Sequence, residues 1–398
     1  MNIINPKLFV EINEINYIFV VGAYDKNQNF RIIEKLITRS EGLNINQITN
    51  VNLASEIIKR EIEKIEKKID HIFNDVIIII DNFNHSCVNI SGFKKLNGSQ
   101  VLKENISYIL NSIKLTINKN EKKKNILHIF NSKSVLDGSI LENLPIGLFG
   151  DFYVHELSFF LIKEIHLKNI NQIFSKNNLV IKKVFLKSFS EGVQLINKEN
   201  VETFFKVNIG KENSKINFFD DASFKYSESF SFGSDIIFKD IMKICSIKFE
   251  TISSFLNSKK FDHQNLNGSD FIEEEYFINE NYRKIRKKLI LDIVNARIEE
   301  IANILFNKNI NIKSFKKNNI NFFINIEEGL IKNNFKKIFE THLLKNTNHK
   351  LKFIDNIPVD ELIINTEQLA TYGWKKEAIP IVQKKNSLIT RIFKYIFG

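Results

Sequence analysis

Two segments of the chain place polar residues at the turn between short apolar stretches, and these are where side chains suited to chemistry gather. The first carries Glu11, Asn13 and Glu14, and the second reads VNIGKENSKINFF from Val207 to Phe219. Turns built of small residues expose backbone N–H groups that bind phosphate, and nearby carboxylates can hold Mg²⁺. The second turn has one glycine beside lysines and a glutamate. It is therefore a phosphate-binding turn, one that has lost this chemistry, or a surface hairpin.

Other residues with catalytic or metal-binding side chains form no pattern of known chemistry. The 8 histidines include no HExxH motif, and their spacing supports no Ser-His-Asp arrangement. Cys87 and Cys245 lie far apart without a CxxC motif. Neither a zinc site nor a disulfide framework is indicated, so we expect no metal site of this kind and a reducing compartment.

The chain is basic, with a formal net charge of +11 and a pI of about 9.2. Such a charge attracts nucleic acid, an anionic membrane or an acidic peptide, although drift of composition toward lysine gives the same excess. A nucleic-acid surface needs clustered basic residues with exposed aromatic ones between them. Here the lysines are spread along the chain and most phenylalanines follow core periodicity, so we expect no nucleic-acid partner.

No apolar run approaches the roughly 18 residues that a membrane-spanning helix needs. The longest is Val76–Ile80, and the N-terminal segment lacks the basic start of a signal peptide. We expect a protein that is soluble or lies on a membrane without crossing it.

The elements around the first turn predict a mixed α/β domain. Phe9–Gly22 is typical of a hairpin of buried strands, and Asn52–Phe73 carries apolar residues at the three- and four-residue spacing of a helix. Val76–Ile80 is short, β-branched and without polar alternation, which indicates a central strand covered on both faces. A hairpin, a helix and a buried strand in this order favour α/β architecture.

The segment 89–149 differs and predicts a small inserted α+β unit, with a helix over Val101–Leu115 and a strand over Ile126–Phe130. The α/β alternation then resumes. We expect helix Leu167–Phe174, strand Val180–Leu186, a helix ending at Ile196, strand Phe204–Ile209, a loop over Glu250–Asp270, the longest helical pattern over Tyr282–Phe306, strand Phe322–Ile326 and helix Leu330–Leu344.

Several short strings, in this order, resemble FtsA, the actin-like family that tethers the FtsZ division ring to the bacterial membrane. They are Asn143–Gly150 (NLPIGLFG), Lys168–Ile170 (KNI), Phe230–Ile241 (FSFGSDIIFKDI) and Ile290–Ile301 (ILDIVNARIEEI). The resemblance spans essentially the whole chain. It implies an actin-like (ribonuclease H-like) fold of two lobes with a small inserted α+β domain, and ATP with Mg²⁺ between the lobes.

The resemblance also implies the domain organisation. Residues 1–83 and 166–195 correspond to lobe I, 84–165 to the inserted domain, and 196–380 to lobe II, whose outer subdomain covers about 240–320 and whose end can pack back on lobe I. Residues 381–398 correspond to a linker and a C-terminal amphipathic membrane helix.

The two turns depart from the phosphate loops that the resemblance implies. Glu11 keeps the acid of the first loop, but Asn13 replaces a glycine. In the second loop Asn208 replaces an acid, Gly210 is retained, and Lys211 replaces a glycine. Without the carboxylate at 208 a cation loses its anchor and the attacking water its orientation. We predict weak or absent ATP binding and negligible turnover, with lysines acting as phosphate partners as the alternative.

The C-terminal segment is typical of a helix that lies in a membrane interface. Ser387 is a suitable N-cap, and basic side chains border the apolar stripe. The alternative is a helix docked on its own domain. The expected membrane-binding residues are Leu388, Ile389, Arg391, Ile392, Phe393, Lys394, Ile396 and Phe397.

The helix around Arg297 lies where the resembled family receives the acidic C-terminal tail of FtsZ. Arg297 and Glu300 are the candidate contacts, and an ordinary solvated helix face is the alternative. The resemblance thus implies an adaptor that is cytoplasmic and peripheral on the inner face of the cell membrane and self-associates into filaments, and the altered loops imply that it acts by binding rather than catalysis. The alternatives are an ATPase or kinase with this fold, or a pilus-assembly relative.

Overall fold

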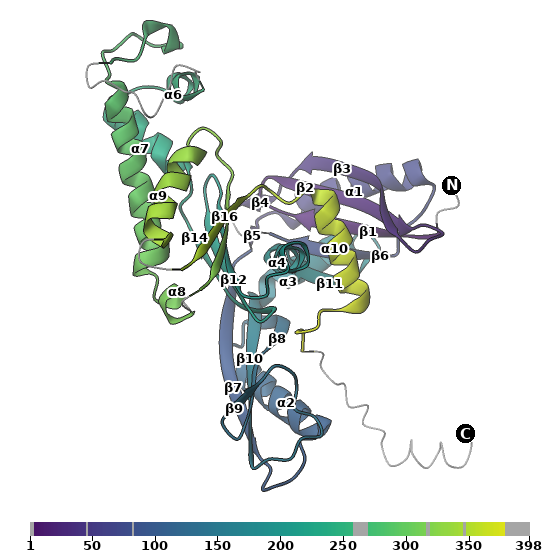
Figure 1. Cartoon of the computed structure of the whole chain (residues 1–398). Helices are drawn as coiled ribbons and strands as arrows, with labels where there is room; N and C mark the ends of the chain where they lie inside the picture. The colour runs from purple at the N-terminus through teal and green to yellow at the C-terminus, as the bar shows by residue number, and fades with distance from the viewer. Residues whose placement is uncertain are drawn as a thin grey trace. The chain divides into compact units, whose positions relative to one another are not determined.

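The computed structural model describes residues 4–44, 47–81, 83–257, 270–315, 319–344 and 348–378. The chain forms two compact units (Figure 1). The larger unit contains Met1–Ser86 and Asn169–Gly373, and the smaller unit contains Cys87–Lys168 with the segment that begins at Trp374.

The first half of the larger unit is a five-stranded sheet, hereafter the N-terminal sheet, with strand order β11-β6-β1-β2-β3. Its strands are β1 (Ile4–Ile12), β2 (Asn16–Tyr24), β3 (Phe30–Arg39), β6 (Asp75–Ile80) and β11 (Val180–Leu186). Strands β1 to β3 form an antiparallel meander, and β6 pairs in parallel with both β1 and β11. All residues from Val76 to Ile80 are buried, which confirms the predicted central strand.

Helices α1 (Val51–Ile69), α3 (Glu164–Ser175), α4 (Lys187–Glu199) and α10 (Val359–Tyr372) accompany this sheet, and β4 (Leu43–Asn44) and β5 (Gln47–Ile48) form a small ribbon. Helix α1 begins where the Asn50 side chain accepts a hydrogen bond from the Leu53 N–H, and it ends at Asp70 in a left-handed conformation. Helix α10 packs on α4 and β3. Its fully buried Glu367 accepts hydrogen bonds from Lys7 and Tyr24 of the first two strands.

The second half of the larger unit repeats this strand arrangement in its C-terminal sheet, whose order is β14-β13-β12-β15-β16. Its strands are β12 (Phe204–Ile209), β13 (Ser214–Asp220), β14 (Ser223–Phe230), β15 (Asn321–Ile326) and β16 (Lys350–Ile354). Strands β12 to β14 form an antiparallel meander, and β15 pairs in parallel with both β12 and β16. The two sheets therefore share one topology, although the sequence shows no repeat of fixed period.

The remaining helices of this half are α5 (Asp235–Cys245), α6 (Phe249–Leu256), η1 (Glu274–Tyr276), α7 (Lys287–Ala302), η2 (Asn303–Lys308), α8 (Ile310–Phe315) and α9 (Lys332–Leu344). The prediction of a loop over Glu250–Asp270 was wrong in its first part, because helix α6 forms there and buries Ile252 and Phe255 in the core. The helix expected from Tyr282 begins only at Lys287. The preceding residues 282–285 are irregular, Arg286 forms an isolated bridge with Phe271, and the Ile272 N–H is bonded to the Ile285 carbonyl.

The smaller unit is a four-stranded sheet of order β7-β10-β8-β9, with helix α2 (Lys103–Asn120) packed against it. Its strands are β7 (His85–Lys95), β8 (Lys124–Leu136), β9 (Ser139–Leu141) and β10 (Phe152–Lys163). The segment after α10 joins this sheet. The Ala378 N–H donates to the Ile129 carbonyl at 2.8 Å, and the Asn131 N–H donates to the Lys376 carbonyl at 2.7 Å.

None of the helices within the described ranges combines the length and apolar character that crossing a membrane requires.

Candidate functional site

The candidate site lies at the carboxyl ends of the parallel strands of both sheets in the larger unit. Asp81 and Lys187 directly follow β6 and β11 of the N-terminal sheet, and Gly210 and Glu327 directly follow β12 and β15 of the C-terminal sheet. Ligands of α/β folds bind at this edge because the strand-to-helix connections there present polar groups.

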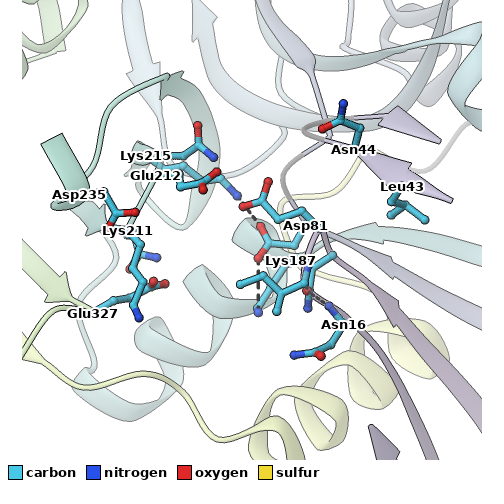
Figure 2. Close-up of a pocket in the computed structure, with 16 residues that line it drawn as sticks. Asn16, Leu43, Asn44, Asp81, Lys187, Lys211, Glu212, Lys215, Asp235 and Glu327 are labelled. Atoms are coloured by element: carbon cyan, nitrogen blue, oxygen red, sulfur yellow. Dashed lines mark hydrogen bonds and ion pairs between the residues drawn. The ribbon is translucent and has the colours of Figure 1, made fainter. Parts of the chain in front are cut away.

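These residues surround one cavity of about 530 Å³ (Figure 2). Asn13, Asn208, Gly210 and Lys211, which the sequence singled out, all line it. Glu11 is fully buried and is linked to the lining by hydrogen bonds from Asn13 and Lys187. The structure thus brings the two predicted turns together, while their binding of a cofactor stays a prediction. The complete lining is Asn13, Glu14, Ile15, Asn16, Leu43, Asn44, Asp81, Lys187, Asn208, Gly210, Lys211, Glu212, Asn213, Lys215, Asp235 and Glu327.

The first turn is closed by the side chain of Asn13. Its Oδ1 accepts hydrogen bonds from the N–H groups of Ile15 at 3.0 Å and Asn16 at 2.8 Å. Its Nδ2 donates to Oε1 of Glu11 at 3.0 Å. The asparagine therefore satisfies backbone donors that a glycine in its place would leave to a ligand.

The second turn is bound by the start of α5. The Ser234 N–H donates to the Gly210 carbonyl and the Asp235 N–H donates to the Lys211 carbonyl, both at 2.9 Å. Gly233 permits this approach, because a Cβ there would lie 2.3 Å from the Gly210 carbonyl oxygen. The Gly210 N–H donates to the Asn213 carbonyl at 3.0 Å, and the backbone of Lys211 acts on the Glu327 carboxylate so as to lower its pKa.

Four charged side chains, Glu11, Asp81, Lys187 and Lys215, form what we call the cleft charge cluster. Lys187 Nζ lies 2.8 Å from Oε1 of Glu11 and 3.4 Å from Oδ2 of Asp81. Lys215 Nζ bonds to Oδ1 of Asp81. Figure 2 shows Asp81 facing both lysines, while Lys211, Asp235 and Glu327 form a second group. The side chains of Asp81, Lys187 and Lys215 are 20%, 23% and 16% exposed.

The cluster shifts the pKa values of two of its members, Asp81 and Lys187. Burial alone raises the pKa of Asp81, but the ammonium groups of Lys215 and Lys187 outweigh it and hold that pKa well below its usual range. Burial lowers the pKa of Lys187, but Asp81 and Glu11 outweigh it and raise that pKa. Outside the cluster, burial and then the charge of Asp81 raise the pKa of Glu327. Asp81 and Lys187 are thus held in their charged forms at neutral pH.

Sequence reasoning did not name Asp81, Lys187 or Glu327. The available signal was their position, since each directly follows a strand that is apolar at its end. Parallel strands bring such residues to one edge of a sheet.

The candidate partner contact has its own ion pairs. Arg297 Nε lies 2.5 Å from Oδ2 of Asp240, and its Nη1 bonds to Glu300. The Arg297 side chain is 28% exposed and that of Glu300 is 54% exposed. The predicted membrane-binding residues from Leu388 to Phe397 lie outside the described residues.

Comparison with known proteins supports the fold. No protein-family model matches the chain. A solved structure, the PilM-PilN type IV pilus biogenesis complex, aligns with a TM-score of 0.54, covering 92% of this chain and 98% of that chain at 9% identity. The chain has the actin-like fold. The predicted fold class is confirmed. The two sheets of equal topology, one in each half of the larger unit, agree with it.

Two curated proteins match in sequence at low identity. Cell division protein FtsA of Buchnera aphidicola subsp. Acyrthosiphon pisum (strain APS) is 21% identical over 302 residues, covering 74% of this chain and 71% of that protein. FtsA of Buchnera aphidicola subsp. Schizaphis graminum (strain Sg) is 21% identical over 312 residues, covering 76% and 73%. These matches support a relationship to FtsA or to other actin-like proteins.

Proposed function

We propose that this protein is a membrane-associated actin-like adaptor of cell division that resembles FtsA. It would connect the FtsZ ring to the inner face of the cell membrane and act by binding and self-assembly. The observation that carries the proposal is the 21% identity to two FtsA proteins over about three quarters of the chain, together with the fold.

The chemistry of the cavity favours binding over catalysis. The position after Val207, where the family holds an acid, is Asn208, and its amide cannot anchor a cation as a carboxylate does. Asp81 is bound by two ammonium groups, so its charge is compensated within the protein. Among the described residues no group of three or more His, Cys, Asp and Glu side chains is arranged to hold a metal ion.

We assign the domains as the resemblance implies. Residues 84–165 are the inserted domain, which corresponds to most of the smaller unit. Residues 1–83 with 166–195 are lobe I, and 196–380 are lobe II with its outer subdomain at about 240–320. The N-terminal and C-terminal sheets support this division, because each lobe then contains one sheet.

The proposed partner surface lies around the start of α7, where basic and apolar side chains are exposed. The exposed basic residues are Arg283, Lys284, Arg286 and Lys288, and Phe271, Tyr282 and Leu289 are exposed large apolar ones. Such a surface suits the acidic, extended C-terminal tail of FtsZ. Arg297 and Glu300 are the proposed contacts on the same helix. A carboxylate of the acidic peptide would replace that of Glu300 as an ion-pair partner of Arg297.

The proposed membrane contact is the segment 387–398. Its apolar stripe and basic border favour insertion into an anionic lipid interface.

Co-sedimentation with anionic liposomes, with and without FtsZ, tests the adaptor. We expect the full chain to bind liposomes and to recruit FtsZ to them. A chain ending at residue 386 is expected neither to bind liposomes nor to recruit FtsZ to them, although it should still bind FtsZ in solution. Failure of the full chain to bind either lipid or FtsZ would refute the proposal.

A matched pair of variants tests the partner contact. Arg297→Ala is expected to weaken binding of the FtsZ tail peptide at least several-fold. Lys332→Ala serves as the control, because Lys332 is also 28% exposed and paired with an acid, Asp355, but lies on α9. Equal loss in both variants would contradict a specific role for Arg297.

The second candidate is a pilus-assembly component, which the likeness to the PilM-PilN complex favours at the level of fold. Such a relative is expected to lack a terminal membrane-binding helix. Liposome binding that depends on residues 387–398 therefore separates the two candidates.

A further inference from the structure

The cleft charge cluster joins the two halves of the larger unit. Asp81 follows β6 of the N-terminal sheet, and Lys215 belongs to β13 of the C-terminal sheet. Their ion pair crosses the cavity between the two sheets, with side chains 20% and 16% exposed. Lys187 holds Asp81 from the other side and also binds the fully buried Glu11. The paired charges therefore form a chain from the buried Glu11 in the N-terminal sheet to Lys215, next to the β12–β13 turn of the C-terminal sheet.

Mg²⁺-ATP, which the resemblance implies, does not fit the backbone donors of this cavity. In the first turn, the N–H groups of Ile15 and Asn16 already donate to Asn13. In the second turn, the Gly210 N–H donates to Asn213, and the Glu327 carboxylate lies beside the turn, with Oε2 3.4 Å from the position of a Cβ on Gly210. A triphosphate would have to displace these bonds, and any acceptor then left without a partner where water is excluded costs about 1–3 kcal/mol.

Mg²⁺-ATP also does not fit the charges. Five carboxylates line the cavity in the described part of the chain against three ammonium groups, namely Glu14, Asp81, Glu212, Asp235 and Glu327 against Lys187, Lys211 and Lys215. Two of these lysines are already paired with Asp81. A triphosphate therefore meets a lining of its own sign, and the repulsion is strengthened where water is partly excluded.

We propose that internal charges replace the cation and the phosphate in this cleft. The ammonium group of Lys215 takes the cation's role beside Asp81, and the carboxylate of Glu327 takes a phosphate's role at the turn that follows β12. The two sheets are then held together without a nucleotide, through the cross-cleft pair of Lys215 and Asp81. This inference does not depend on the proposed partners.

Hydrogen exchange followed by mass spectrometry on the full chain tests this inference. In the unchanged protein, we expect millimolar Mg²⁺-ATP to leave exchange in the segments around Asp81 and the β12–β13 turn unaltered. In Lys215→Met, exchange in both segments is expected to rise several-fold, because the cross-cleft pair is lost and the two sheets open more often. Lys215→Arg keeps the charge and is expected to retain most of the protection.

Lys225→Met is the matched control. Lys225 is 12% exposed and pairs with Asp220 within the C-terminal sheet, so its loss does not cross the cleft. It is expected to leave the Asp81 segment unaffected, and far-UV circular dichroism checks that each variant is folded. Protection of both turns by Mg²⁺-ATP in the unchanged protein, or unaltered exchange in Lys215→Met, would overturn the inference. Neither readout involves lipid or FtsZ, so the adaptor proposal stands or falls separately.

Discussion

The substitution Asp81→Asn removes the negative charge shared by Lys187 and Lys215. Breaking one side of a buried ion pair costs about 3–5 kcal/mol, because the remaining charge is left desolvated. Here Lys187 still has its ion pair with Glu11, at 2.8 Å. The Lys215 side chain is 16% exposed, so some water reaches its ammonium group. We therefore expect a loss of about 2–3 kcal/mol in the free energy of unfolding at neutral pH, at or just below the lower end of that range.

The loss should depend on pH in a defined direction. The two lysines hold the pKa of Asp81 below its ordinary value of 3.8. A lowered acid pKa gives stability that is complete above the ordinary value and disappears as the pH falls toward the native pKa. The difference between the unchanged protein and Asp81→Asn is thus expected to be constant from about pH 5 upward and to shrink below about pH 4.

Urea unfolding monitored by far-UV circular dichroism measures this difference. Tryptophan fluorescence is unsuitable, because the single tryptophan, Trp374, belongs to the smaller unit. The double variant Asp81→Asn, Lys215→Met removes both charges and should recover roughly half of the loss, since no ammonium is left unpaired by the first change. A loss below about 0.5 kcal/mol, or one of equal size at all pH values, would refute the assigned role of Asp81.

Three further substitutions test the packing and ionisation of single residues. In Gly192→Ala, the new Cβ would lie 1.9 Å from the Phe219 ring, so overpacking should lower the free energy of unfolding by about 1–3 kcal/mol in urea titrations. Burial lowers the pKa of His155 from 6.5 to about 4, so the smaller unit should lose stability as the pH falls from 6.5 to 4. His155→Leu should remove that dependence, as followed by Trp374 fluorescence. Asn50→Ala removes the N-cap of α1 and should cost about 1 kcal/mol, measured as a lower melting temperature; an unchanged value would assign the helix start to packing alone.

Much of the architecture could be predicted because its strands and helices have strong periodic signals. The apolar run Val76–Ile80 indicates a buried strand, and the apolar spacing in α1 indicates a helix with one buried face. Both elements were predicted correctly. The short helix α6 was missed because its eight residues have no side-chain cap and follow no long apolar pattern. Its helical state depends on burial against the core that the rest of the chain provides.

The candidate site could be predicted only in part. The two turns were found from local sequence, and they line one cavity. Their chemistry is set by residues far along the chain, such as Lys187 opposite Glu11 and Glu327 opposite Lys211. No local pattern indicates which lysine meets which acid, because that choice follows from sheet pairing and strand order. The role of Asn13 as acceptor for its own turn was likewise not predicted.

The route of the chain after α10 has a mechanical consequence. Lys376–Ala378 bond to Ile129 and Asn131 of β8, and His128 Nδ1 lies 3.3 Å from Oε1 of Glu377. A pull applied to the chain beyond residue 378 therefore loads the sheet of the smaller unit before it reaches α10. If the following segment is fixed to a surface, tension acts first on the few main-chain hydrogen bonds between residues 376–378 and β8. Helix α10 and its buried Glu367 bear the load only after those hydrogen bonds break.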